Sequence, residues 1–230
     1  MVGNSALAIA NPRGYTVADM SFTLFIDTET TSKYHFKLPE NHHTQPHLVQ
    51  IGALLLDGDR RVRGEMNLII RPDGWTIPKE ASCIHGITQE IANECGVCLC
   101  DALMVFFQLH AAADTVVAHN IDFDQAVINC AAHRTATRLE IAASPALFRY
   151  KATFCTMRAM TPICQLPGSY GDYKWPKLQE AYLHAFGSEF DGAHDAMADV
   201  RACASLYWWL KDGGDDTTPL TPPSPLAILP

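Results

Sequence analysis

Blocks of apolar and polar residues divide the chain into strand-like runs followed by longer helical patterns. Residues 22–26 (FTLFI) form a short run of apolar, β-branched and aromatic residues, which is typical of a buried strand. Two further runs, 48–56 and 63–70, flank a short Gly-containing turn and predict an antiparallel hairpin. Beyond residue 100, helical spacing dominates. Strands in a meander that precede alternating strands and helices predict an α/β fold, with helices on the faces of a mixed sheet.

The second half of the chain contains two short strand-like runs and five helical patterns. The predicted strands are 115–118 and 152–156, and the predicted helices are 101–112, 122–133, 138–148, 176–186 and 195–211. Asp101 and Asp195 are expected to be N-caps, because a short carboxylate accepts hydrogen bonds from first-turn N–H groups. Pro176 is expected near the first position of its helix, and Gly187 is expected to end it. Pro145 interrupts the weakest of these patterns.

Composition divides the chain into an N-terminal arm (1–20), one domain (21–212) and a Pro-rich tail (213–230). The apolar run in the arm is short and follows no basic residue, which favours an arm over a secretory signal. The tail is too rich in proline for regular structure and is expected to be extended or disordered. A docking peptide for a protein partner is the less favoured interpretation of this tail.

Residues 32–47 are interpreted as a His-rich loop inserted between two strands. The loop contains four histidines, which are His35, His42, His43 and His47. A solvated loop is favoured over a metal site. A C-x-x-C pattern at 95–98 has no second ligand pair at a suitable spacing, so a cysteine-rich loop is favoured there over zinc.

Overall composition restricts the function classes further. With 48% hydrophobic and 18% charged residues among 230, the chain can bury a core, and no apolar run is long enough to cross a membrane. Eight cysteines without regular spacing suggest free thiols in a reducing compartment, so we expect a cytoplasmic protein. The net charge of −8 argues against duplex binding through a basic face. It does not argue against an enzyme that binds phosphate through metal ions.

Asp27 and Glu29 follow the first apolar run directly. Residues two apart on a strand point to the same side of the sheet, so both carboxylates share one face. Two like charges this close are unfavourable without a cation. The alternative is a solvated strand end, but open α/β sheets place ligand sites where a core strand ends.

Further candidate groups occur where helices are predicted to begin. Asp124 falls in a first helical turn, where the helix dipole favours an anion. Residues five apart on a helix do not share a face, so His194 and Asp199 converge only if His194 lies in the loop before a helix that Asp195 caps. Taken alone, Asp124 and His194 are each better explained by a structural role.

Together the four carboxylates and the histidine indicate one kind of chemistry. Carboxylate oxygens suit hard divalent ions such as Mg²⁺ or Mn²⁺. Two ions about 3.5–4 Å apart can stabilise the attacking and leaving oxygens of a phosphodiester. Histidine changes its charge near neutral pH and can accept the proton of the attacking water.

Three segments, FIDTETT (25–31), AHNIDFD (118–124) and AHDAMADV (193–200), resemble in order and content the motifs of the DEDDh 3′-to-5′ exonucleases. This family includes the proofreading subunit of bacterial DNA polymerase III, ribonuclease T and oligoribonuclease. The connecting segments IPKEASCIHGIT, TFCTMR and PKLQEAYLHAFG are also similar to that family. The resemblance extends over about residues 22–209.

The resemblance implies a ribonuclease H-like fold with a mixed five-stranded sheet. It implies that Asp27, Glu29, Asp124 and Asp199 bind two divalent ions, Mg²⁺ or Mn²⁺, with Asp27 bridging them. It further implies that His194 is the general base and that nucleoside 5′-monophosphates are released.

The resemblance also implies contacts with the substrate. The implied residues are Thr28, Thr30, Ile84, His85, Asn120 and Phe123. The backbone around the two threonines should contact the terminal nucleotide, and the side chains of Ile84, His85 and Phe123 should stack against the last bases regardless of sequence. For Asn120, support of the strand–helix turn is at least as well founded as substrate contact.

The chain departs from the family after Thr31, where the insertion at 32–47 replaces the usual glycine. We expect an exonuclease acting on single-stranded or frayed 3′ ends of DNA, in proofreading or repair. A 3′-to-5′ exoribonuclease is the alternative within this class, and a non-catalytic nucleic-acid-binding module is the alternative outside it. No association with a membrane is expected. The sequence does not indicate the oligomeric state.

Overall fold

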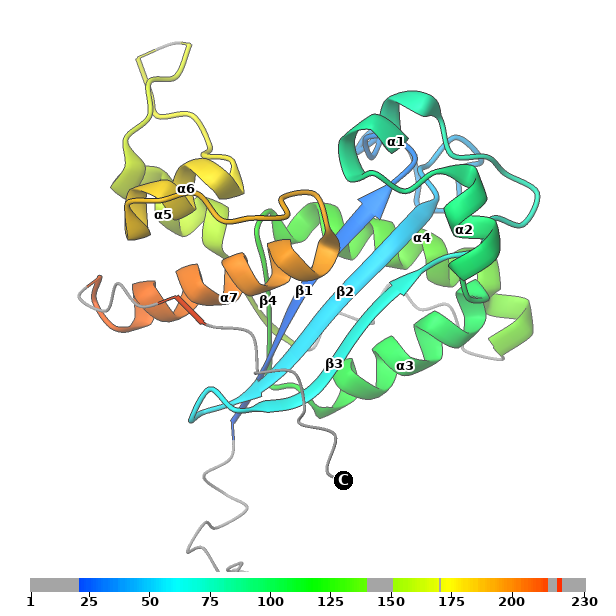
Figure 1. Cartoon of the computed structure of the whole chain (residues 1–230), viewed down its shortest axis with the longest axis horizontal. Coiled ribbons are helices and arrows are strands. Elements are labelled where there is room, and N and C mark those ends of the chain that lie inside the picture. The colour runs from blue at the N-terminus through cyan, green and yellow to red at the C-terminus, as the bar shows by residue number, and fades with distance from the viewer. Residues whose placement is uncertain (1–20, 140–150, 170, 215–218, 221–230) are drawn as a thin grey trace, which may run out of the picture.

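The computed structural model describes residues 21–139, 151–169, 171–214 and 219–220. At its centre is a five-stranded sheet with the strand order β3-β2-β1-β4-β5 (Figure 1). β1 (Phe22–Thr30) lies in the middle, antiparallel to β2 (Leu48–Asp57) and parallel to β4 (Thr115–Ala118). β3 (Val62–Ile69) is antiparallel to β2, and β5 (Ala152–Cys155) is parallel to β4. The predicted mixed five-stranded sheet is therefore confirmed.

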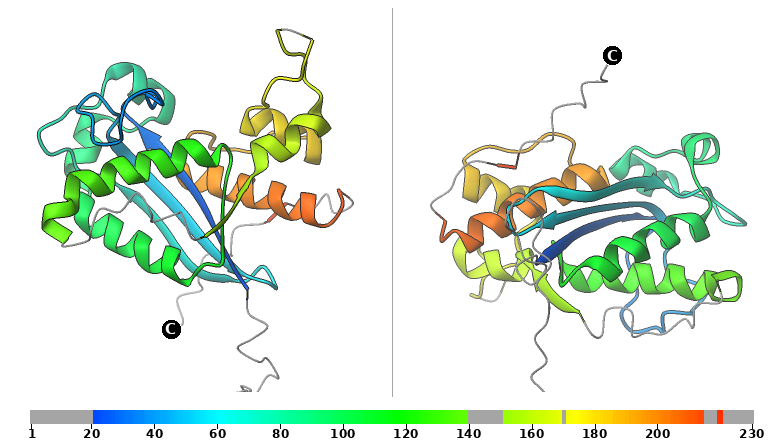
Figure 2. Two further views of the ribbon diagram at one scale, coloured as in Figure 1. Left: turned by 180° about the vertical axis from the view of Figure 1, so that it is seen from behind. Right: turned by 90° about the horizontal axis from the view of Figure 1, so that it is seen from below.

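Helices cover both faces of the sheet, which explains why β1 and β2 are apolar along most of their lengths. α3 (Leu99–Ala112) and α4 (Ile121–Leu139) pack on one face, and α7 (Ala196–Lys211) packs on the other (Figure 2). Side chains of β1 alternate between the two cores. Leu24 and Ile26 face α3 and α4, whereas Phe25 faces α7.

Four shorter helices complete the fold. α5 (Thr156–Cys164) and α6 (Leu178–Phe186) pack beside α7 through a core of their own. α1 (Lys79–His85) and α2 (Gln89–Cys95) follow β3 and lie near the end of β1 where its carboxylates are (Figure 1). None of the helices in the described ranges is long and apolar enough to span a membrane.

Several element boundaries differ from the sequence-based expectation. β1 continues to Thr30 because β2 pairs with it along its whole length. α3 begins at Leu99, so Asp101 lies in its first turn and Cys98 is the N-cap instead. α6 begins at Leu178, which leaves Pro176 just before the helix rather than at its first position.

Other predicted elements are extended, missed or outside the described residues. α4 runs on to Leu139, past its predicted end at residue 133, and most of the weak pattern at 138–148 lies outside the described residues. α1, α2 and α5 are absent from the sequence-based prediction. α1 and α2 have only seven residues each, which is too short for a clear helical pattern. Gly187 ends α6 in a left-handed conformation, as expected.

The 32–47 insertion contains no helix or strand, yet it is folded against α4 rather than solvated throughout. Gln45, only 2% exposed, lies at its centre and donates from its amide to three loop carbonyls. These carbonyls belong to His35, Leu38 and Pro39. Arg134 on α4 donates to the carbonyls of Gln45 and Pro46, and Glu40 contacts Asn129 and His133. Hydrogen bonds within the loop and to α4 therefore help to hold this insertion in place.

The arm at 1–20 and most of the tail lie outside the described residues. Of the tail, Leu220 is described, and its backbone N–H donates to the hydroxyl of Ser205 on α7. The eight cysteines all fall within the described ranges and are free thiols.

Candidate active site

Asp27 and Glu29 lie in the second half of β1 and point toward the start of α7. Their β2 partners are Gly52 and Gln50. A Cβ added to Gly52 would approach the carbonyl group of Ala196 to 2.8 Å, so only glycine lets the first turn of α7 come this close to the sheet. The small residue on β2 thereby brings the α7 terminus beside the two carboxylates.

Asp124 reaches the same place from the opposite face of the sheet. It lies in the first turn of α4, is 2% exposed, and its carboxylate accepts a 2.8 Å hydrogen bond from the hydroxyl of Thr28. Asn120, directly before this helix, has a left-handed backbone with φ of 81°. Its carbonyl accepts from the N–H of Phe123, which closes the turn between β4 and α4.

His119 supports this turn from the outside. Its Nε2 lies 2.9 Å from the carbonyl of Pro176, and its Nδ1 lies 3.0 Å from the hydroxyl of Thr156. Burial lowers the pKa of His119 to about 4, so its ring is neutral. A neutral ring can donate from Nε2 and accept at Nδ1, which matches both partners.

The α7 terminus has the arrangement that the spacing required. Asp195 is the N-cap, and its carboxylate accepts from the backbone N–H groups of Met197 and Ala198. His194 lies in the loop before the helix with a φ of 71°, and its N–H approaches the carboxylate of Asp199 at 3.3–3.4 Å. Asp199 lies in the first turn of this helix.

Gln50 on β2 is a positioning residue that the sequence analysis missed. It is 4% exposed, and its amide donates to the carboxylate of Asp195 at 3.0 Å and to Asn67 at 2.8 Å. Its amide oxygen accepts from the N–H of Ala196 at 3.3 Å. A single amide side chain inside the apolar run 48–56 was the available signal, because a buried polar group normally has a defined partner.

The acidic side chains converge. Glu29, His194 and Asp199 each offer one potential ligand atom, and these atoms all lie within 4.8 Å of one another. The carboxylate of Asp27 is repelled by those of Asp124, Asp199 and Glu29, which places all four in one electrostatic cluster. The five residues that the sequence analysis singled out are thus brought together from β1, α4 and the start of α7.

Burial and mutual repulsion disfavour ionisation of this cluster. Burial is the main cause that raises the pKa of Glu29 to about 8 and the pKa values of Asp124 and Asp199 to about 7. The pKa of Asp27 is raised well above its usual range by burial and then by its acidic neighbours. A divalent cation would remove this penalty, so the donor set fits a metal centre.

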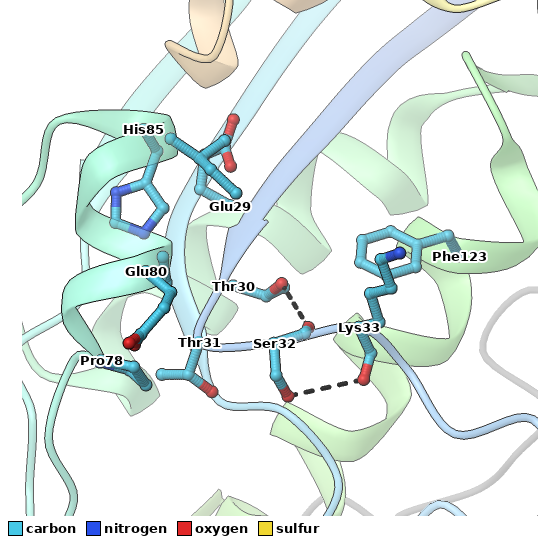
Figure 3. A pocket seen from close by; sticks show the side chains of 11 residues that line it. Glu29, Thr30, Thr31, Ser32, Lys33, Pro78, Glu80, His85 and Phe123 are labelled. Atoms are coloured by element: carbon cyan, nitrogen blue, oxygen red, sulfur yellow. Dashed lines mark hydrogen bonds between the residues drawn. The ribbon is translucent and has the colours of Figure 1, made fainter.

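A pocket of about 440 Å³ opens beside Glu29 (Figure 3). His85 on α1 and Phe123 on α4 lie on opposite sides, with the end of β1 between them. Thr30 and Ile84 also line it, as do Lys33 and Glu80, which the sequence analysis did not single out.

Two of the six residues expected to contact substrate lie outside this lining. These are Thr28, whose hydroxyl is bonded to Asp124, and Asn120, which forms the turn before α4.

Comparisons with known proteins agree with this fold. The RNase_T family model, described as exonuclease, matches residues 24–207. An uncharacterized exonuclease, CP81, of Escherichia phage 186 is 27% identical over 198 residues, which cover 83% of this chain and 89% of that protein.

Two solved structures of exonuclease I from E. coli are also similar. The complex with a dT13 oligonucleotide aligns with a TM-score of 0.64 and 23% identity over 83% of this chain, and the zinc-bound complex with single-stranded DNA aligns with a TM-score of 0.62 and 22% identity over 84%. The chain spans 41% of the length of each of these proteins. At this identity the likeness concerns the fold, which is ribonuclease H-like. The family match over most of the chain shows that it belongs to the RNase_T exonucleases, within the DEDDh class of 3′-to-5′ exonucleases.

Proposed function

We propose that the protein removes nucleotides from the 3′ ends of single-stranded or frayed DNA, using divalent metal ions and a histidine base. The convergence of Glu29, His194 and Asp199 beside an open pocket is the observation that carries this proposal. DNA is favoured because the similar exonuclease I structures contain dT13 and dA16 oligonucleotides.

Asp27, Glu29, Asp124 and Asp199 would hold two ions, of which Mg²⁺ and Mn²⁺ fit oxygen ligands best. Such ions polarise the attacking water and stabilise the charge that develops on the phosphate. The chain's own contribution is to gather four acids whose pKa values are raised by burial and by repulsion between neighbouring carboxylates. Burial of Asp124 and its bond from Thr28 fix one side of this ligand set.

His194 would act as the general base. It is exposed, so solvent can take up the transferred proton, and the bond from its N–H to Asp199 fixes its backbone next to the acids. The water oxygen attacks the phosphorus of the terminal phosphodiester while its proton passes to the imidazole. The bond from phosphorus to the 3′ oxygen breaks, and this leaving oxygen takes a proton from solvent. The products are a nucleoside 5′-monophosphate and a strand one nucleotide shorter with a 3′ hydroxyl.

The pocket beside Glu29 would receive the terminal nucleotide. His85 is 8% exposed, and its Nδ1 accepts from the N–H of Ile87, which leaves the proton on Nε2. Nε2 has no partner among the described residues and is available as a donor to a substrate oxygen. Ile84 and Phe123 offer apolar and aromatic surfaces that accept any base.

End-labelled single-stranded DNA, duplex DNA and RNA, each incubated with Mg²⁺ or Mn²⁺, test this proposal through product length over time. We expect single-stranded DNA to shorten stepwise from its 3′ end and EDTA to stop the reaction. Faster degradation of RNA would favour the exoribonuclease alternative, internal cuts would contradict the exonuclease assignment, and binding without cleavage would favour the non-catalytic module.

Asp27→Asn tests the assignment of the site, with Glu94→Gln, an exposed acid on α2, as its matched control. We expect Asp27→Asn to abolish hydrolysis and Glu94→Gln to leave it unchanged. Full activity of Asp27→Asn would contradict the metal centre proposed here.

A cytoplasmic location and a protein partner for the tail stay predictions.

A further inference from the structure

A second cavity of about 450 Å³ lies apart from the acidic cluster and shares no lining residue with the pocket beside Glu29. It is formed where the insertion joins β2, where β3 leads toward α1, and where α3 begins beside the second half of α4 (Figure 1). Its volume lies within the range of small-molecule sites. Nothing in the proposed hydrolysis uses it.

One wall of this cavity is aromatic. The rings of His47 and Trp75 are stacked with centroids 4.7 Å apart and planes inclined by 11°. Burial, with a smaller contribution from the charge of Arg134, lowers the pKa of His47 to about 4, so this ring is uncharged at neutral pH. A flat, uncharged pair of rings is a suitable surface for a nucleobase.

Positive charge in the cavity comes from Arg71 and Arg134, which both line it. Among the arginines whose side chains the structure describes, these two alone have no carboxylate partner. The others, Arg60, Arg61, Arg63, Arg158 and Arg201, each contact an aspartate or a glutamate.

Arg134 is anchored, because its two terminal nitrogens donate to the carbonyls of Pro46 and Gln45 at 2.6 Å. Its remaining N–H donors and the whole guanidinium of Arg71 stay available. One acid, Asp73, is in the lining, so the cavity carries a net charge of +1 in a chain of net charge −8.

We propose that this cavity binds a nucleotide, with its phosphate at Arg71 and Arg134 and its base against the rings of His47 and Trp75. Arginine suits phosphate because its planar fork donates two parallel hydrogen bonds. The start of α3 adds to the attraction for an anion, since its N-cap Cys98 makes no side-chain capping bond. The nucleotide is either free, as a nucleoside monophosphate, or part of a strand.

Equilibrium binding of dAMP, inorganic phosphate and a short oligothymidylate, each measured in EDTA, tests the proposal without relying on hydrolysis. Arg71→Glu is the test variant, because this side chain is exposed and has no carboxylate partner within the described part of the chain. Lys37→Glu is the matched control, because it reverses the charge of another exposed cation that lies outside the cavity. We expect Arg71→Glu to weaken dAMP binding at least tenfold and Lys37→Glu to leave it unchanged.

The oligothymidylate identifies the source of the nucleotide. Arg71-dependent binding of dAMP would identify a free nucleotide as the ligand, whereas Arg71-dependent binding of the oligonucleotide alone would identify a strand. Binding of inorganic phosphate as tight as that of dAMP would overturn the proposal, because the aromatic wall would then contribute nothing to the affinity. Binding in EDTA that is lost in Asp27→Asn would also overturn it, because the nucleotide would then occupy the acidic cluster. These measurements involve neither metal nor catalysis. Their result can therefore be interpreted even if the protein has no nuclease activity.

Discussion

Two residues of the site, Asn120 and His194, have left-handed backbones although neither is glycine. Such a conformation costs about 1–2 kcal/mol for most residues, and less for asparagine. Asn120 directly precedes α4, and His194 directly precedes Asp195, the N-cap of α7. The first turns of these helices contribute Asp124 and Asp199. The left-handed backbone at these two residues turns the chain so that both acids point toward β1. The strained backbone is therefore part of how the site is built.

Asn120 should therefore be replaceable by glycine but not by alanine. We expect Asn120→Gly to keep the thermal stability and the nuclease activity, and Asn120→Ala to lower the free energy of unfolding by about 1 kcal/mol. Thermal unfolding of both variants measures this. Asn93→Gly inside α2 is the control and should destabilise, since glycine is unfavourable within a helix. A loss of activity in a stable Asn120→Gly would instead assign the side chain to the substrate.

His194→Ala should slow hydrolysis by about 10²–10⁴, which is the usual contribution of a positioned base, and should leave the fold intact. Rates under saturating substrate, together with circular dichroism, check both parts. His184→Ala, at an exposed position on α6, is the control and should retain the full rate. An unchanged rate in His194→Ala would mean that another group accepts the proton of the water.

At the scale of elements, the start of α7 is the part of the site whose placement depends most on distant residues. Gly52 allows its close approach to β2, and Gln50 bonds both to its N-cap Asp195 and to the N–H of Ala196. His194 and Asp199 flank this anchored turn. Their positions therefore follow from β2 as well as from α7 itself.

Gln50→Leu should lower the affinity for Mn²⁺ and the hydrolysis rate by roughly tenfold or more, a usual effect of losing a group that orients metal ligands. Leu55→Ala, a buried change on the other face of β2, is the control. It should destabilise the fold by about 2–5 kcal/mol yet retain the activity of the folded protein. If the activity of both variants simply follows their stability, Gln50 has no separate positioning role.

At the scale of the whole molecule, the acidic cluster makes the stability depend on pH. Burial and repulsion raise the pKa values of Asp124 and Asp199 to about 7 and that of Glu29 to about 8, whereas carboxylates of an unfolded chain titrate near 4. Between these limits the folded chain binds more protons than the unfolded chain. The unfolding free energy must then fall as the pH rises.

We accordingly expect the melting temperature of the metal-free protein to decrease between about pH 4 and pH 8, and Mg²⁺ to reverse the decrease near pH 8. Scanning calorimetry in EDTA and in Mg²⁺ provides the comparison. Asp199→Asn should flatten the pH dependence, because it removes one of the raised carboxyl groups. A melting temperature that rises over this interval without metal would contradict the described electrostatics of the cluster.

The sequence by itself determined what depends on local pattern. The run 22–26 identified the core strand, Asp195 identified the start of α7, and the ordered motifs singled out the five residues that converge in the structure. These features are readable because apolar runs, caps and motif spacing each involve residues close together in the chain.

Only the tertiary structure decided the rest. The seven-residue helices α1 and α2 are too short to be stable alone, so packing against the sheet determines them. Gln50 and Asp195 meet across 145 positions of sequence, and the cavity with Arg71 and Arg134 is assembled from several separate segments. Which distant residues become neighbours depends on how the sheet and helices pack, and no local pattern contains that information.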